Sequence, residues 1–154
     1  VLDTTVTYDF SFVGRDKGRG EMLNDLKNQL EYMGYRCNFD IRSANQSNIS
    51  YIDYLKISLS AKCMIEVLQD NQSGMTLRAI EAILYGRKLL TNNPNIENEQ
   101  LYDESDILLY QSTLNHEKIH RFMNTPARGS DNQQSIQYHE SAAVIKSIIE
   151  SINK

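Results

Sequence analysis

Short apolar segments of strand length alternate along this chain with longer segments whose apolar residues recur at helical spacing. Strands are expected at residues 6–13, 36–41, 63–68, 88–91 and 107–110. Helices are expected at residues 20–35, 52–59 and 77–84 and, near the C-terminus, at residues 142–152. Strands that alternate with helices favour parallel pairing through right-handed crossovers. The pattern therefore predicts an α/β protein: one three-layer, Rossmann-like domain with a central, mainly parallel sheet of about five strands.

Length and composition favour one globular domain over residues 1–154. The hydrophobic fraction of 40% and the charged fraction of 23% are ordinary for a folded chain and exclude a disordered one. A net charge of −4 gives no general attraction for nucleic acid, so we expect no nucleic-acid partner. Cys37 and Cys63 each lie in an apolar, strand-like segment. We therefore expect both to be buried, reduced thiols, which fits a cytoplasmic protein. Because a strand begins almost directly after Val1, we expect this domain to be part of a longer protein.

The loop between the first strand and the first helix has the character of a phosphate-binding loop. Gly14 and Gly18 permit close backbone approach, and Arg15, Lys17 and Arg19 add positive charge before a helix N-terminus. Its glycine spacing is neither that of a Walker A motif nor that of the full dinucleotide fingerprint, so an ordinary solvated turn is the alternative interpretation. The second strand is not followed by an acidic residue placed to bind a cofactor ribose, which disfavours an NAD-dependent dehydrogenase.

A second helix start follows the buried strand at residues 63–68. Ser73, Gly74 and Thr76 place hydroxyls and a glycine at this start, which suits an anion. Arg78 and Glu81 are three residues apart and share one helix face. They form either a surface ion pair or a pair of groups that reach one ligand.

Residues 73–82 (Ser-Gly-Met-Thr-Leu-Arg-Ala-Ile-Glu-Ala) and residues 83–93 (Ile-Leu-Tyr-Gly-Arg-Lys-Leu-Leu-Thr-Asn-Asn) resemble the bacterial lipopolysaccharide and capsule glycosyltransferases. The resemblance is to the C-terminal, nucleotide-sugar-binding half of enzymes with two Rossmann-like halves (the GT-B architecture), and it spans residues 8–110. It implies transfer of a sugar from a nucleotide-sugar donor to a glycan or lipid-linked acceptor that is bound through an N-terminal domain. It also implies a cytoplasmic enzyme, associated with the inner face of the membrane as a full-length protein, and no cofactor.

The resemblance implies a role for each matching residue. Glu81 would bind the ribose hydroxyls and Arg78 would offset phosphate charge. Many of these transferases carry an acidic residue where this chain has Ser73. The remaining residues that would contact the donor phosphates are Ser73, Gly74, Met75 and Thr76 in the second segment and Gly14, Arg15, Lys17 and Gly18 in the first. The resemblance assigns no catalytic residue.

Other polar clusters indicate no further chemistry. His116 and His120 share a helix face but lack a partner at metal-ligand spacing, and the acidic residues near position 104 are typical of a solvated loop, so no metal site is expected. The tyrosines are scattered, and half-buried packing explains them. They are Tyr32, Tyr35, Tyr51, Tyr54, Tyr85 and Tyr102.

Two other functions remain open at the level of sequence. One is a noncatalytic, flavodoxin-like phosphate-binding or regulatory module, for instance a receiver domain with Asp70 as its phosphoacceptor. The other is a small complete hydrolase, although the chain has no nucleophile motif of the G-x-S-x-G type.

Overall fold

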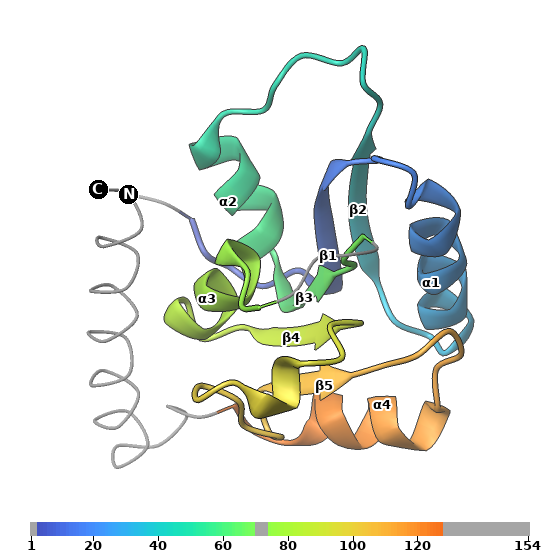
Figure 1. Ribbon diagram of the computed structural model, residues 1–154, viewed down its shortest axis with the longest axis vertical. Helices are drawn as coiled ribbons and strands as arrows, with labels where there is room; N and C mark the ends of the chain where they lie inside the picture. The colour runs from blue at the N-terminus through green and yellow to red at the C-terminus, as the bar shows by residue number, and fades with distance from the viewer. Residues whose placement is uncertain (1–2, 70–73, 128–154) are drawn as a thin grey trace.

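The computed structural model describes residues 3–69 and 74–127, which form alternating strands and helices (Figure 1). The elements in chain order are β1 (Tyr8–Arg15), α1 (Gly20–Tyr32), β2 (Cys37–Arg42), α2 (Tyr51–Leu59), β3 (Ala61–Glu66), α3 (Leu77–Leu84), β4 (Lys88–Thr91), a short 3-10 helix η1 (Ile96–Asn98), β5 (Ile107–Leu109) and α4 (His116–Asn124). The helix expected at residues 142–152 lies outside the described residues.

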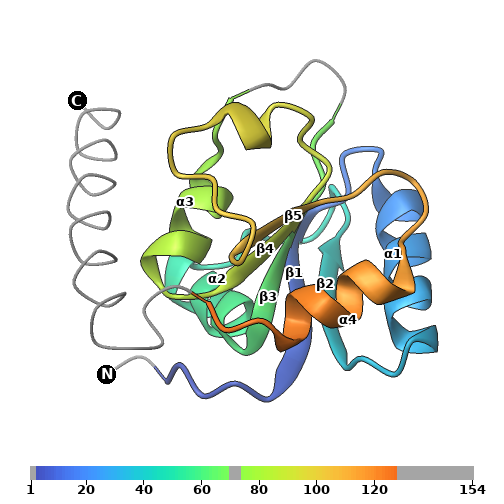
Figure 2. The same ribbon diagram turned by 90° about the horizontal axis from the view of Figure 1, so that it is seen from below.

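The described strands form one five-stranded sheet in the order β2-β1-β3-β4-β5, and each neighbouring pair is parallel. Helices α1 and α4 cover one face of the sheet, and α2 and α3 cover the other (Figures 1 and 2). The predicted α/β, Rossmann-like fold with a parallel sheet of five strands is thus confirmed.

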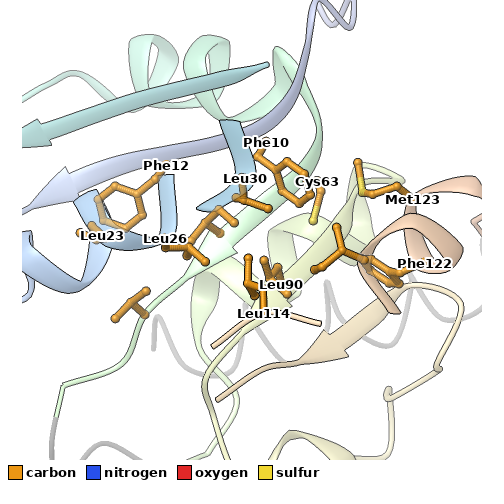
Figure 3. Packing of buried hydrophobic residues seen from close by; sticks show 13 residues of the cluster. Phe10, Phe12, Leu23, Leu26, Leu30, Cys63, Leu90, Leu114, Phe122 and Met123 are labelled. Carbon is orange, nitrogen blue, oxygen red and sulfur yellow. The ribbon is translucent and has the colours of Figure 1, made fainter. Parts of the chain in front are cut away.

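The core consists of two layers of apolar side chains, one on each face of the sheet. The interior strand β3 contributes to both, because Cys63 and Ile65 point to one face and Met64 to the other. This is why three consecutive residues of β3, Cys63, Met64 and Ile65, are apolar instead of alternating with polar ones. Figure 3 shows the layer beneath α1 and α4, which consists of Phe10, Phe12, Leu23, Leu26, Leu30, Cys63, Ile65, Val67, Leu90, Leu114, Ile119, Phe122 and Met123. The layer beneath α3 consists of Met64, Ala79, Ile80, Ala82, Ile83, Leu89, Ile96 and Ile107.

Helix boundaries follow the turn and capping residues of the sequence. Gly34, after α1, and Gly86, after α3, have φ values of +93° and +68°, which favour glycine and end both helices. Side chains at the N-cap position begin the later helices: Ser50 accepts a backbone N–H of α2, Thr76 one of α3 and Asn115 one of α4. Among the described residues, no helix is both long and apolar enough to cross a lipid bilayer.

Strand β1 continues two residues beyond its predicted end. Gly14 pairs with Ile41 and Arg15 pairs with Arg42 in the ladder with β2. Tertiary pairing thus extends a strand past the glycine that was expected to end it. Gly14 and Arg15 therefore belong to the carboxyl end of strand β1, and the loop to α1 contains only residues 16–19.

Candidate functional site

The carboxyl ends of β1 and β3 lie side by side where the chain changes direction across the sheet. From β1 the chain passes through α1 to β2 on one side, and from β2 it passes through α2 to β3 on the other side of β1. Open parallel sheets form a ligand-binding crevice outside the strand ends at such a switch point. A cavity of about 490 Å³ lies here. The residues that line this switch-point cavity are Arg19, Ile49, Tyr51, Tyr54, Glu66, Leu68, Thr76, Leu77, Arg78 and Glu81.

Two tyrosines of α2 bind the carboxylate of Glu81. Glu81 lies on α3 and is only 2% exposed. Tyr51 Oη donates a hydrogen bond of 2.7 Å to Glu81 Oε2, and Tyr54 Oη donates one of 3.0 Å to Oε1. A buried carboxylate needs such donors, because leaving a buried charge unpaired costs several kcal/mol. Tyr51 and Tyr54, the tyrosine pair, therefore fix the position of this carboxylate in the cavity.

The tyrosine pair lies on one face of the first turn of α2. Its rings stack with their centroids 5.9 Å apart and an interplanar angle of 17°. Burial raises the pKa of both hydroxyls, and the hydrogen bond to Glu81 raises the pKa of Tyr51 further. Both hydroxyls are therefore protonated at neutral pH and act as donors. Tyr51 nevertheless keeps 55% of its surface exposed, so its ring is accessible to a ligand.

Arg78, in the first turn of α3, connects the ends of the two central strands. Its Nη2 donates to the carbonyl oxygen of Val13 in β1 at 2.7 Å, and its Nη1 lies 3.4 Å from the carbonyl oxygen of Ile65 in β3. The guanidinium carbon lies 4.7 Å from the centroid of the Phe12 ring. Arg78 therefore contacts neutral groups at the sheet edge, whereas Glu81 binds the tyrosine pair. These contacts take the place of the surface ion pair that the spacing of Arg78 and Glu81 allowed.

Arg19 approaches the same place from the start of α1. Its Nη1 donates to the carbonyl oxygen of Val67 at 2.6 Å, and its guanidinium carbon lies 5.1 Å from the centroid of the Phe12 ring. A Cβ atom on Gly14 would lie 3.2 Å from Arg78 Nη2 and 3.3 Å from Arg19 Nη2. Arg19 and Arg78, the guanidinium pair, thus meet beside Gly14. Burial, and after it the charge of Arg78, lower the pKa of Arg19.

The helix starts at this edge already contact carboxylates of the chain itself. At α1, Asp16 Oδ1 accepts the first backbone N–H of the helix at 2.9 Å. At α3, the N-cap hydroxyl of Thr76 donates to Glu66, which also accepts a hydrogen bond of 2.8 Å from Thr91 Oγ1. Negative charge near a helix N-terminus is stabilising. From the sequence we expected a bound anion to place negative charge at these two helix starts. In the structure, the carboxylates of Asp16 and Glu66 supply that negative charge.

The structure brings together three of the residues predicted to contact a donor nucleotide: Thr76, Arg78 and Glu81 line the cavity. Gly14 lies beneath the guanidinium pair. Gly74 adopts a φ of +86° before the N-cap of α3. Met75 packs against the apolar layer under α3, and Ser73 lies outside the described residues.

The other predicted residues lie outside the cavity lining. Arg15 donates to the carbonyl oxygen of Ser43 and, at 2.7 Å, to Asn48 Oδ1, both in the β2–α2 loop. Lys17 and Gly18 are exposed, with φ values of 49° and 79°, at the tip of the β1–α1 turn. Arg15, Lys17 and Gly18 are therefore not part of the cavity lining.

Glu66 and the tyrosine pair line the cavity but were not predicted as site residues from the sequence. Glu66 could have been predicted, since it is the one carboxylate in the apolar segment at residues 63–68 and a buried carboxylate needs a partner. Tyr51 and Tyr54 have the spacing of a shared helix face, but Glu81 lies 27 positions after Tyr54. Only the tertiary fold joins them.

Residues 3–69 and 74–127, which the structure describes, contain no group of three or more His, Cys, Asp or Glu side chains placed to hold a metal ion. His120 Nδ1 instead lies 2.5 Å from Tyr35 Oη. Asp103 accepts a hydrogen bond of 2.9 Å from the backbone N–H of Ser105, within its own turn.

No protein-family model, curated protein or solved structure matches the chain. The geometry of the switch-point cavity is therefore the basis for any functional conclusion.

Proposed function

We propose that this chain is the donor-nucleotide-binding domain of a glycosyltransferase that transfers a sugar from a nucleotide-sugar to a glycan or lipid-linked acceptor in surface-polysaccharide biosynthesis. The observation that carries the proposal is the buried carboxylate of Glu81, which lines a cavity of about 490 Å³ together with two guanidinium groups and an accessible aromatic ring. Cavities that bind small molecules have volumes of roughly 300–1,000 Å³.

Glu81 is suited to bind the two ribose hydroxyls of a nucleotide. An ionised carboxylate offers about four lone-pair sites. The tyrosine pair uses one site on each oxygen atom, so each oxygen retains acceptor capacity for a hydroxyl. Because two donors already fix the carboxylate, it needs little reordering when a sugar binds.

The exposed ring of Tyr51 lies next to Glu81 and offers a surface for the nucleobase. Bases stack on aromatic side chains with a contribution of about 1–3 kcal/mol each in single-stranded nucleic-acid complexes. Tyr54 supports the Tyr51 ring from within the stack. A nucleoside with its ribose at Glu81 would therefore have an aromatic ring within reach of its base.

The chemistry of such a domain is mainly positional. It would hold the nucleoside diphosphate and stabilise the negative charge that develops on it as the bond to the sugar breaks. A second domain would bind the acceptor at the inner face of the membrane. The domain on its own is therefore expected to bind the nucleotide but to turn over poorly.

An amide NMR titration with UDP, GDP, CMP, ADP and dTDP tests the proposal. We expect saturable shifts at Thr76, Arg78 and Glu81 for one preferred nucleotide, and we expect Glu81→Gln to weaken that binding. Tyr32→Phe is the matched control, because Tyr32 is 85% exposed and lies outside the cavity lining. If none of the nucleotides binds, or if Glu81→Gln binds as well as the unaltered chain, the assignment fails.

The strand order favours one alternative, a noncatalytic flavodoxin-like module. The order β2-β1-β3-β4-β5 is that of flavodoxin-like sheets, whereas the six-stranded dinucleotide-binding order carries an extra strand beyond β2. A receiver domain of this kind would use Asp70, which lies outside the described residues. Shifts at Asp70 caused by Mg²⁺ and a phosphate mimic, with no response to nucleotides, would support this alternative.

A further inference from the structure

The positive charge of the switch-point cavity comes from the side chains of the guanidinium pair. At the starts of α1 and α3, Asp16 and Glu66 already offset the positive ends of the helix dipoles. A phosphate placed at either helix start would meet one of these carboxylates. Arg19 and Arg78 donate their hydrogen bonds to backbone carbonyls, which carry no net charge, and Asp16 and Glu66 act on Arg19 only through their charge.

The guanidinium pair is arranged as a rigid double cation. Each guanidinium has five N–H donors, of which the bonds to backbone carbonyls use two. Both groups pack on the Phe12 ring and approach each other beside Gly14, where the missing Cβ leaves room for them. Burial and the like charge of Arg78 disfavour the cation at Arg19, while Asp16 and Glu66 partly compensate. A bound dianion would relieve the remaining repulsion.

We propose that the guanidinium pair, and not the glycine-containing loops, is the phosphate-binding element of the cavity and that it takes a diphosphate group. The assignment of that diphosphate to a nucleotide rests on the proposed function above. Arg78 and Glu81 lie one helical turn apart on α3. One helix face thus offers a cation to the phosphates and a carboxylate to the ribose of the same ligand.

Inorganic pyrophosphate is the probe that isolates this site, because it carries neither base nor ribose. Isothermal titration calorimetry would measure its affinity for the unaltered chain and for Arg19→Gln and Arg78→Gln. Arg36→Gln is the matched control. Arg36 also packs on an aromatic ring, 5.3 Å from the centroid of Tyr8, but at the amino ends of the strands.

We expect saturable pyrophosphate binding that falls about tenfold or more in each cavity variant and stays within about twofold in the control. Arg19→Lys and Arg78→Lys keep the charge but lose the paired N–H donors, and we expect them to show intermediate losses. Thermal unfolding of each variant would identify those that fail to fold, and only folded variants enter the comparison.

A second series separates a phosphate contact from a structural role. The preferred nucleoside diphosphate and its parent nucleoside would be titrated into the unaltered chain and the Lys variants. We expect the loss to occur for the diphosphate and not for the nucleoside. Equal losses for both ligands, or pyrophosphate binding that does not respond to Arg19 and Arg78, would overturn the inference.

The outcomes also separate this inference from the proposed function. Nucleotide binding that is unaffected by substitution of either arginine would refute the inference and leave the donor-binding function in place. Pyrophosphate binding that depends on both arginines, without binding of any nucleotide, would retain the anion site and remove the donor-binding function. Absence of saturable binding for pyrophosphate and nucleotides alike would remove both.

Discussion

Removing one hydroxyl from the tyrosine pair tests whether these two donors stabilise the buried carboxylate of Glu81. Tyr54→Phe deletes the donor to Oε1 and leaves its ring stacked on Tyr51. Tyr51→Phe deletes the donor to Oε2. Both substitutions remove one oxygen atom from the same residue type, bound to the same carboxylate. They differ in exposure, since Tyr54 is half-buried whereas Tyr51 is 55% exposed, and the hydroxyl of Tyr54 also interacts with Arg78.

The expected costs follow from that difference. A hydrogen bond to a charged group contributes about 1.5–3 kcal/mol, and removing a donor from a buried acceptor costs at least as much. We therefore expect Tyr54→Phe to lower the free energy of unfolding by about 2 kcal/mol. Because 55% of the Tyr51 surface is exposed, water can reach the place of the deleted hydroxyl, and we expect Tyr51→Phe to cost less than about 1 kcal/mol.

Urea unfolding followed by circular dichroism would measure both free energies, with Tyr32→Phe as the control for an exposed tyrosine. The same substitutions in a Glu81→Gln background complete a double-mutant cycle. In that background the acceptor is neutral, and we expect the cost of Tyr54→Phe to fall to about 1 kcal/mol. Equal costs for Tyr51→Phe and Tyr54→Phe, or a Tyr54→Phe cost unchanged by Glu81→Gln, would refute this account of the site.

Gly14→Ala should weaken pyrophosphate binding in calorimetry, because the added Cβ would lie too close to the guanidinium pair. Gly18→Ala is the control: it is strained by about 1 kcal/mol at positive φ, so it should lower the free energy of unfolding and leave pyrophosphate affinity unchanged. A loss of affinity confined to Gly18→Ala would contradict the location of the site. Stability should decrease as pH rises above about 10, because the unfolded chain releases tyrosine protons that the folded chain retains at raised pKa. Urea unfolding at increasing pH should show a shallower decrease for Tyr54→Phe, and an unchanged slope would contradict the raised pKa. Burial raises the pKa of Cys37 to about 12, and Cys63 is fully buried, so a thiol reagent at neutral pH should react slowly with both in the native chain and rapidly in urea. Fast labelling of Cys63 in the folded chain would be inconsistent with this core.

Local patterns in the sequence predicted most of the fold. The strand at residues 88–91 and the helix at residues 77–84 have their predicted bounds, because apolar periodicity and the following Gly86 fix them locally. The end of β1 was placed too early, since Gly14 and Arg15 join the sheet through pairing with β2, a contact between distant segments. Sequence periodicity cannot report such a pairing.

The candidate site, like the fold, was predictable from the sequence only in part. The sequence by itself determined the class of fold, the helix start at Thr76 and the presence of Arg78 and Glu81 on one helix face, because these depend on residues within a few turns of each other. Only the tertiary structure brought α2 to Glu81 and placed Arg19 beside Arg78. It also decided that the side chain of Arg15, a predicted phosphate contact, donates hydrogen bonds to the β2–α2 loop. The physical reason is that hydrogen bonds and charge pairs form wherever the packed strands and helices bring the groups together, and that packing depends on the whole chain.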